Sequence, residues 1–185
     1  MPDDPGAIAL SVVAQLRHLD PGALAALRRM DDDGAVPAFW RLAASREPLS
    51  RRADRWAPIV RALAILTPKG TPEERPDLHD AKRPLGEALC DGGNPDWPGA
   101  PRPMLSERRL AQLMAARAKQ RTVLLTRAIR ALAASKSSDA GLRVPDIAIA
   151  FLDPARPELL AAPYYRRLDR AERAANALED TERDA

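Results

Sequence analysis

Residues 105–134, LSERRLAQLMAARAKQRTVLLTRAIRALAA, decide the fold class of this 185-residue chain. Alanine and leucine dominate this stretch, and both residues are strong helix formers. Ser106 is the expected N-cap of a helix, and Leu105 and Leu110 are placed to form a hydrophobic staple across it. At about 100° per residue most of the leucines fall on one side, so the stretch predicts an amphipathic helix.

Two arginines interrupt the apolar face of that helix. Arg117 and Arg121 fall among the leucines when residues 106–134 are drawn as one straight helix. Burying two unpaired guanidinium groups is costly, so the sequence predicts a break near Ala115–Arg121. The break would give two helices and let both arginines reach solvent.

The rest of the chain has the pattern of helices separated by proline and glycine. Further helices are expected at Ile8–Leu19, 21–30, from Pro37 onward, Arg52–Leu66, Pro84–Cys90, 144–152 and Glu158–Glu179, with a frayed tail after the last. Asp20 is the expected N-cap of the second of these helices. No stretch predicts a β-strand, so the fold class is all-α.

Two proline-rich segments interrupt the helical pattern. Residues 67–83 are polar and predict a mobile loop. Residues 92–103, GGNPDWPGAPRP, hold four prolines and three glycines and are the best candidate for a linker. We therefore predict two small helical bundles, residues 1–91 and residues 104–185, joined by this linker.

The chain has three tryptophans, and their positions predict different surroundings. Trp40 and Trp56 lie at helical core spacing and are expected to pack in the core. Trp97 lies between prolines in the predicted linker. We expect it to fold back on a domain, with stacking on a nucleic-acid base as the alternative.

Little in the sequence is typical of an enzyme. The two histidines, His18 and His79, and the single cysteine, Cys90, have no spacing typical of a metal site. Glycine motifs for nucleotides are missing. The consecutive aspartates 31–33 make a poor metal clamp, because adjacent residues at a helix end do not face each other. We predict no catalytic residue, no metal and no cofactor.

The sequence also lacks the patterns of a membrane or secreted protein. No apolar run reaches the roughly 20 residues that a membrane span needs. The acidic start, MPDDPGAIAL, has no basic region of the kind that opens a signal peptide. A lone cysteine agrees with a reducing compartment, and we expect a cytoplasmic protein.

Positive charge is concentrated in the middle of the chain. Residues 102–136 carry nine Lys/Arg against one acidic residue, a net charge of +8, whereas the residues on either side are slightly acidic. Such asymmetry favours a face that binds a polyanion. The alternative interpretation is an ordinary solvated helix face.

Several short patterns follow one another along residues 10–175. They are AALRRM (25–30), VPAFWRL (36–42), a Trp-led helix (56–66), PLGEAL (84–89), LSERRLAQL (105–113), LLTRAIRAL (124–132) and PYYRRL (163–168). In their order and spacing they resemble the CasB family, the small subunits of type I-E CRISPR Cascade. Compared with that family, residues 92–103 look like an insertion.

The resemblance implies an all-helical, two-bundle protein without enzymatic activity. It also implies contacts with the backbone and large subunits of Cascade, with a second copy of the chain and with the guide RNA. Its role would be to steady the target and displaced DNA strands of the R-loop, which agrees with the charge pattern, because Lys/Arg grooves hold single strands without reading sequence.

The candidate nucleic-acid-binding residues are basic side chains of the central segment and of two blocks that match the family. They are Arg28, Arg29, Arg108, Arg109, Arg117, Lys119, Arg121, Arg127, Arg130, Arg166 and Arg167. At least one of Arg28 and Arg29 is expected to face solvent and contact phosphate. The alternative function is a helical adaptor whose basic face docks an acidic protein partner.

Overall fold

The computed structural model describes residues 4–34, 36–98, 102–137 and 140–183. These residues form ten helices and no β-strand, and their one β-type pairing is an isolated bridge between His79 and Leu142. The prediction of an all-α fold is therefore confirmed. Residues 99–101 of the predicted linker and the last two residues of the tail lie outside the described residues.

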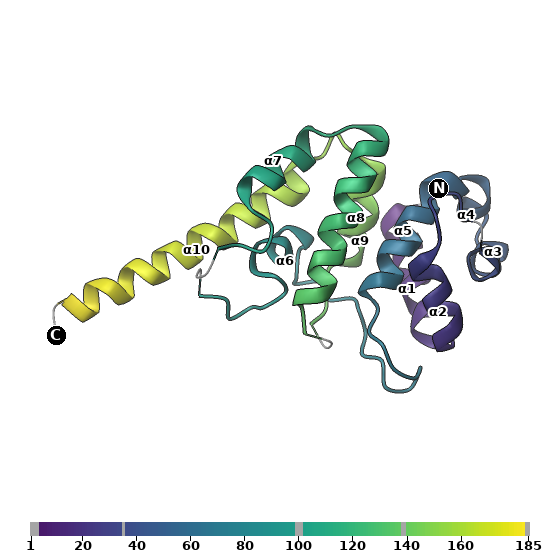
Figure 1. Ribbon diagram of the computed structural model, residues 1–185, viewed down its shortest axis with the longest axis horizontal. Helices are drawn as coiled ribbons and strands as arrows, with labels where there is room; N and C mark the ends of the chain where they lie inside the picture. The colour runs from purple at the N-terminus through teal and green to yellow at the C-terminus, as the bar shows by residue number, and fades with distance from the viewer. Residues whose placement is uncertain (1–3, 35, 99–101, 138–139, 184–185) are drawn as a thin grey trace.

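The helices are arranged along the length of the molecule. They are α1 (Pro5–His18), α2 (Pro21–Arg29), α3 (Pro37–Ala44), α4 (Glu47–Arg51), α5 (Ala53–Leu66), α6 (Leu85–Asp91), α7 (Glu107–Ala115), α8 (Ala118–Ser135), α9 (Val144–Leu152) and α10 (Glu158–Arg183). Figure 1 shows α1–α5 at one end, α8 and α9 in the middle, and α6, α7 and α10 at the other end.

Aspartate caps set the first two helix starts. Asp20 accepts a hydrogen bond from the backbone amide of Ala23 at 2.9 Å, as predicted. Asp4 does the same for the amide of Gly6 at 3.0 Å, so α1 begins before the predicted Ile8. Proline at the first helical position supports both starts, because its fixed φ suits a helix and its missing N–H is not needed there.

The largest differences from the predicted helices are α4 and α10. The five residues of α4 were not predicted, because one turn is too short to show a helical period. α10 continues to Arg183 instead of ending at Glu179, and Figure 1 shows its last turns extending away from the other helices. No helix among the described residues combines the length and the apolar character that crossing a bilayer requires.

The packing of the helices crosses the predicted division at residues 92–103. α1 packs on α9, α5 packs on α8 and α9, and α6 packs on α10. Buried side chains from both sides of the division, including Leu16, Leu63, Leu89 and Ile129, belong to one core cluster. Residues 1–91 and 104–185 therefore share a core in this structure.

The contact between α6 and α10 is close enough to require glycine. A Cβ placed on Gly86 would lie 2.2 Å from the carbonyl oxygen of Leu160, far inside van der Waals contact. Beside it, Tyr164 is fully buried and its hydroxyl donates to the carbonyl of Leu105 at 2.6 Å. α6 is thus held against the C-terminal helix rather than against the N-terminal helices alone.

Residues 92–103 leave α6 and return to it. The amide of Met104 donates to the carbonyl of Cys90 at 2.8 Å, and the amide of Leu105 donates to the carbonyl of Leu89 at 3.0 Å. Trp97 packs against the core, which confirms the prediction that it folds back on the protein. We call this segment the excursion, and its interpretation as an insertion relative to the family stays a prediction.

The segment at 67–83 is irregular, as predicted, but it is packed rather than a free mobile loop. Arg75 is 1% exposed and donates to the carbonyls of Leu19 at 2.6 Å and Gly70 at 2.8 Å. Leu78 is buried in the core. The buried arginine satisfies backbone carbonyls at the end of α1, which ties the segment to the N-terminal helices.

The two helical tryptophans have different environments. Trp56 is 3% exposed and lies in the core, as predicted. The same prediction is wrong for Trp40, which is 48% exposed. α3 buries Phe39 and Leu42 instead, and this places Trp40 on the outer side of the helix.

Candidate nucleic-acid interface

The predicted break lies between α7 and α8, and the two arginines next to it, Arg117 and Arg121, have different environments. Arg117 is exposed, and its Nη1 lies 3.1 Å from each of the last three carbonyls before the break. A cation is favourable there because the carbonyl end of a helix carries partial negative charge. The predictions of a break and of an exposed Arg117 are both confirmed.

Arg121 is not exposed, and the prediction that it reaches solvent is wrong. Only 3% of its surface is accessible. Its Nε donates to the carbonyl of Ala150 in α9, and its Nη1 donates to the carbonyl of Leu113 in α7, both at 3.1 Å. Burial lowers the pKa of Arg121, and the charge of Arg117 lowers this pKa further. The break brings the carbonyl of Leu113 within reach and the packing of α9 brings that of Ala150, and these two acceptors keep the side chain inside.

One side of α8 is exposed and cationic. Lys119, Arg127 and Arg130 are exposed, and they fall within about 80° of one another around the helix. Val123, 37% exposed, lies between them. Residues 118–135 contain no aspartate or glutamate, so no carboxylate on this helix competes for the three cations. We call Lys119, Arg127 and Arg130 the α8 cationic face.

A groove between α7 and α8 connects this face to α7. It has a volume of about 350 Å³, and Leu113, Leu124 and Ala128 are among its lining residues. Arg109 from α7 and Arg127 from α8 line the same groove and are both exposed. Two cations from separate helices therefore border one apolar groove, while Arg108 is exposed beside Arg109.

The predicted pair on α2 has one partly buried and one exposed member. Arg28 donates to the carbonyls of Ala64 at 2.9 Å and Thr67 at 2.7 Å, at the C-terminal end of α5. Burial, and then the charge of Arg75, lower the pKa of Arg28. Arg29 is exposed, so the expectation that one of the two faces solvent is confirmed. Its contact with phosphate remains a prediction.

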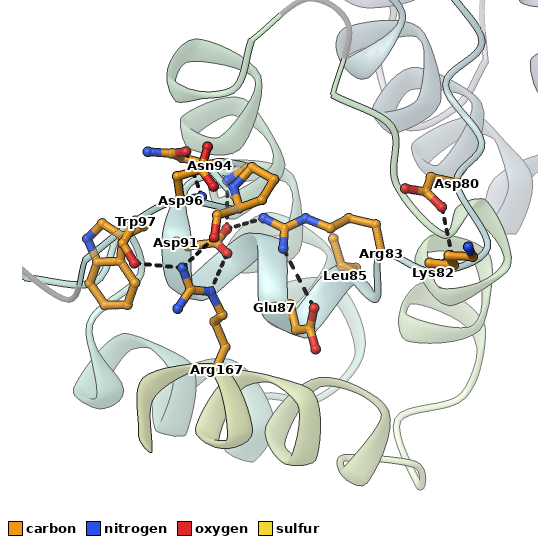
Figure 2. A network of polar contacts seen from close by, with 12 residues as sticks. Asp80, Lys82, Arg83, Leu85, Glu87, Asp91, Asn94, Asp96, Trp97 and Arg167 are labelled. Carbon is orange, nitrogen blue, oxygen red and sulfur yellow. Dashed lines mark hydrogen bonds and ion pairs between the residues drawn. The ribbon is translucent and has the colours of Figure 1, made fainter. Parts of the chain in front are cut away.

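The predicted pair on α10 divides in the same way. Arg166 is exposed, whereas Arg167 is 5% exposed and its Nε lies 2.8 Å from Oδ2 of Asp91. Arg83 pairs with the other oxygen of Asp91 at 2.6 Å, as Figure 2 shows. We call Arg83, Asp91 and Arg167 the Asp91 cluster. The guanidinium of Arg167 also lies 5.3 Å from the ring centroid of Trp97.

The Asp91 cluster explains why Arg167 does not join the surface. Its Nη2 donates to the carbonyls of Trp97 at 2.7 Å and Pro95 at 3.0 Å, which fixes the excursion at residues 92–103 to α10. The sequence offered no signal for this, because the carboxylate belongs to α6, far from Arg167 in the chain. Arg167 therefore holds the protein together instead of pointing outward.

Some features of the surface were not predicted at all. Arg51, Arg52 and Arg55 are exposed at the junction of α4 and α5, and sequence reasoning missed them because the residues before the central segment are slightly acidic overall. Within the described part of the chain, no three His, Cys, Asp or Glu side chains gather as a metal site. The charged groups that this surface presents to a partner are guanidinium and ammonium groups.

Comparison with known families agrees with the sequence patterns. A family model described as CRISPR-associated protein Cse2 matches residues 23–148, more than half of the chain. No curated protein matches the chain, and no solved structure matches it. The matched range includes α7, α8 and the arginine pair on α2 but ends before α10. The chain therefore belongs to the Cse2 family, the CasB family of type I-E Cascade, whose members are subunits of that CRISPR complex.

Proposed function

We propose that this Cascade subunit holds the backbone of nucleic-acid strands, independently of sequence and without catalysing a reaction, and so stabilises the R-loop. Its partners would be the guide RNA, the target and displaced DNA strands, and a second copy of the chain. The observation that carries the proposal is the α8 cationic face, in which three exposed cations share a helix without a carboxylate.

The surroundings of these cations suit phosphate rather than base recognition. Arg109 and Arg127 border an apolar groove between two helices, so their positive charges are spread along the groove rather than concentrated at one position. Phosphate contacts position a strand but carry no sequence information. R-loop formation is energetically near balance, so a modest number of backbone contacts is enough to favour it.

The proposed surface consists of the exposed members of the predicted set. They are Arg29, Arg108, Arg109, Arg117, Lys119, Arg127, Arg130 and Arg166. Arg28, Arg121 and Arg167 are left out of this surface, because their hydrogen bonds hold parts of the chain together.

The test is the salt dependence of binding by the double variant Arg109→Gln/Arg127→Gln. Fluorescence anisotropy with a single-stranded oligonucleotide gives the slope of log affinity against log salt. Each phosphate contact on a single strand contributes about −0.7 to that slope, so losing two contacts flattens it by about 1.4. The matched control is Arg41→Gln/Arg173→Gln, which removes the same charge from exposed sites on α3 and α10 and should leave the slope unchanged.

Two outcomes would contradict the proposal. An unchanged slope in a folded Arg109→Gln/Arg127→Gln variant would remove this groove from the site. If charge reversal of Arg108, Arg109 and the α8 cationic face left both oligonucleotide binding and R-loop formation by assembled Cascade intact, the basic face would instead dock an acidic protein.

A further inference from the structure

A second pocket lies at the N-terminal end of α8, on the opposite side from Arg130. It has a volume of about 410 Å³ and is lined by parts of three helices and the turn after α9. Arg121 and Arg130 are nine positions apart, which places them about 180° apart around the helix. This pocket is therefore separate from the groove between α7 and α8.

The wall of this pocket contains a guanidinium that forms no salt bridge among the described residues, although the charge of Asp153 partly offsets the lowering of its pKa. Arg121 lines the pocket, and its Nη2 is buried without a hydrogen-bond partner. Among the described residues, no carboxylate forms a salt bridge with Arg121, whose other nitrogens donate to backbone carbonyls. Buried arginines are normally paired with an anion, because an isolated buried charge is strongly unfavourable.

The start of α8 at the same pocket is also without an anionic partner. The N-cap residue, Arg117, makes no side-chain capping hydrogen bond, and the first turn contains no acidic residue. Ala118, which lines the pocket, has a φ of 44°, which is uncommon for a residue other than glycine. The first amides of this 18-residue helix point toward its N-terminal end, where partial positive charge favours an anion.

The charges around the pocket favour phosphate over an acidic peptide. Arg55 from α5 is exposed and lines the pocket, and the exposed Arg117 and Lys119 are the chain neighbours of Ala118. Asp54 is the one carboxylate among the described lining residues. Arg55 at the opening and Arg121 in the wall outnumber this carboxylate, and such a balance suits a chain of phosphates, which presents negative charge at every backbone unit.

We infer that this pocket binds one backbone phosphate of a nucleic-acid strand, held by Arg121 and the first amides of α8 with Arg55 at the rim. The inference rests on the proposed function for the origin of the phosphate, but the pocket itself is a distinct site. Lys119 of the α8 cationic face and Arg121 of this pocket lie on opposite sides of the first turn of α8, so a strand that follows the face reaches the pocket by passing around the start of the helix.

The experiment is an NMR titration of the ¹⁵N-labelled full-length chain with inorganic phosphate at constant ionic strength. The amides of residues 118–121 and the Nε of Arg121 should shift together and saturate. Arg121→Gln leaves two carbonyls unpaired and is a poor test, so Ala118→Asp is used to place a carboxylate at the helix start. It should weaken phosphate binding by roughly tenfold, because it supplies the anion within the chain.

Two further variants complete the design. Arg55→Gln, on the exposed rim, should weaken phosphate binding several-fold without affecting the fold. Arg173→Gln removes an exposed arginine from α10, outside both the pocket and the proposed surface, and should bind phosphate like the wild type. Saturation confined to residues 118–121, lost in Ala118→Asp and kept in Arg173→Gln, would support the inference.

Other results would overturn it. These are an absence of shifts at the start of α8, or equal phosphate affinity in the wild type, Ala118→Asp and Arg55→Gln. A polyglutamate peptide and a short single-stranded oligonucleotide are titrated as further arms. Shifts at residues 118–121 caused by the peptide but not by the oligonucleotide would reject a nucleic-acid strand as the ligand.

The result is separable from that of the proposed function. If phosphate and the oligonucleotide bind at residues 118–121 while Arg109→Gln/Arg127→Gln keeps the wild-type salt slope, the pocket stands and the groove between α7 and α8 fails. If the salt slope flattens while the phosphate titration gives no shifts there, the groove stands and the pocket fails.

Discussion

The α8 cationic face and the Asp91 cluster both contain basic side chains contributed by helices, yet their surroundings are opposite. Arg127 and Arg130 are exposed, on a helix that has no acidic residue. Arg83 and Arg167 are largely buried, and both pair with Asp91, whose side chain is fully buried. The first group is available to a partner outside the chain, and the second has its partner inside.

What separates the two groups is a carboxylate brought close by tertiary packing. Arg166 and Arg167 are adjacent in sequence, but only Arg167 points toward α6 and its Asp91. Net charge along the sequence counts both arginines equally. In a chain with so many arginines, the exposed and unpaired ones define the candidate binding surface. The paired ones hold segments of the fold together.

The largest expected effect comes from breaking the Asp91 cluster. Asp91→Asn removes the charge that Arg83 and Arg167 share. It leaves the buried guanidinium of Arg167 without an anion and that of Arg83 with Glu87 alone, at 3.6 Å. We expect the free energy of unfolding to fall by about 3–5 kcal/mol, measured by urea denaturation. The control is Asp96→Asn, at an exposed aspartate of the same excursion. Equal stability of the two variants would show that the cluster does not hold the fold.

A smaller effect is expected from exchanging one arginine of the adjacent pair. Arg167→Lys keeps the charge but loses the planar group that reaches Asp91, Pro95 and Trp97 together. Hydrogen bonds to charged groups contribute about 1.5–3 kcal/mol, so we expect a loss in that range. Arg166→Lys should stay within about 0.5 kcal/mol, because Arg166 is exposed. A similar loss in both would contradict the division between them.

Asp146 sharpens the comparison, because it is a buried carboxylate that forms no salt bridge with a guanidinium in the described part of the chain. It accepts a hydrogen bond from the amide of Leu85 at 3.1 Å, and burial raises its pKa despite this bond. The folded protein therefore holds a proton on Asp146 more tightly than the unfolded chain does. The stability contributed by this site is greatest in acid and is lost as the pH rises through the folded pKa.

The variant Asp146→Asn tests this pH dependence. The stability of the wild type relative to Asp146→Asn should fall as the pH rises above about 4, the ordinary pKa range of aspartate, because only the wild type loses a proton at this site. Urea denaturation of both proteins at a series of pH values gives the difference directly. A difference that stays constant with pH would show that Asp146 titrates alike in the folded and unfolded chain.

The smallest effect on stability is expected at the exposed face. Arg109→Gln/Arg127→Gln should change the free energy of unfolding by no more than about 0.5 kcal/mol per residue, because exposed side chains without partners contribute little. Thermal and urea unfolding measure this on the same samples used for the salt series. A large loss of stability would mean that Arg109 and Arg127 hold the fold together, as the arginines of the Asp91 cluster do.

The parts of the structure that depend on neighbouring residues could be predicted from the sequence. The cap at Asp20 follows from local residue types, and the break between α7 and α8 follows from two arginines on an apolar face. The exposed arginines of α8 follow from the same helical period. In each case the deciding interactions lie within a few residues of one another.

The parts that depend on distant segments could not be predicted in this way. Arg121 is buried because the carbonyl of Ala150 in α9 accepts a hydrogen bond from its Nε, and no local pattern in the sequence predicts that approach. Trp40 is exposed because Phe39 and Leu42 take the buried side of α3. The segment at 67–83 has the composition of a free loop, but Arg75 finds carbonyl acceptors at the end of α1.

The packing of α1 on α9 has a consequence for how the chain is made. These helices lie near opposite ends of the sequence, and a Cβ on Gly6 would meet Pro145 at 3.0 Å. During synthesis, the buried side of α1 stays uncovered until α9 has left the ribosome, when most of the chain has been made. Closing so long a loop slows folding and leaves apolar surface uncovered in the meantime. Truncation before α9 should therefore leave the N-terminal helices prone to aggregate rather than folded on their own.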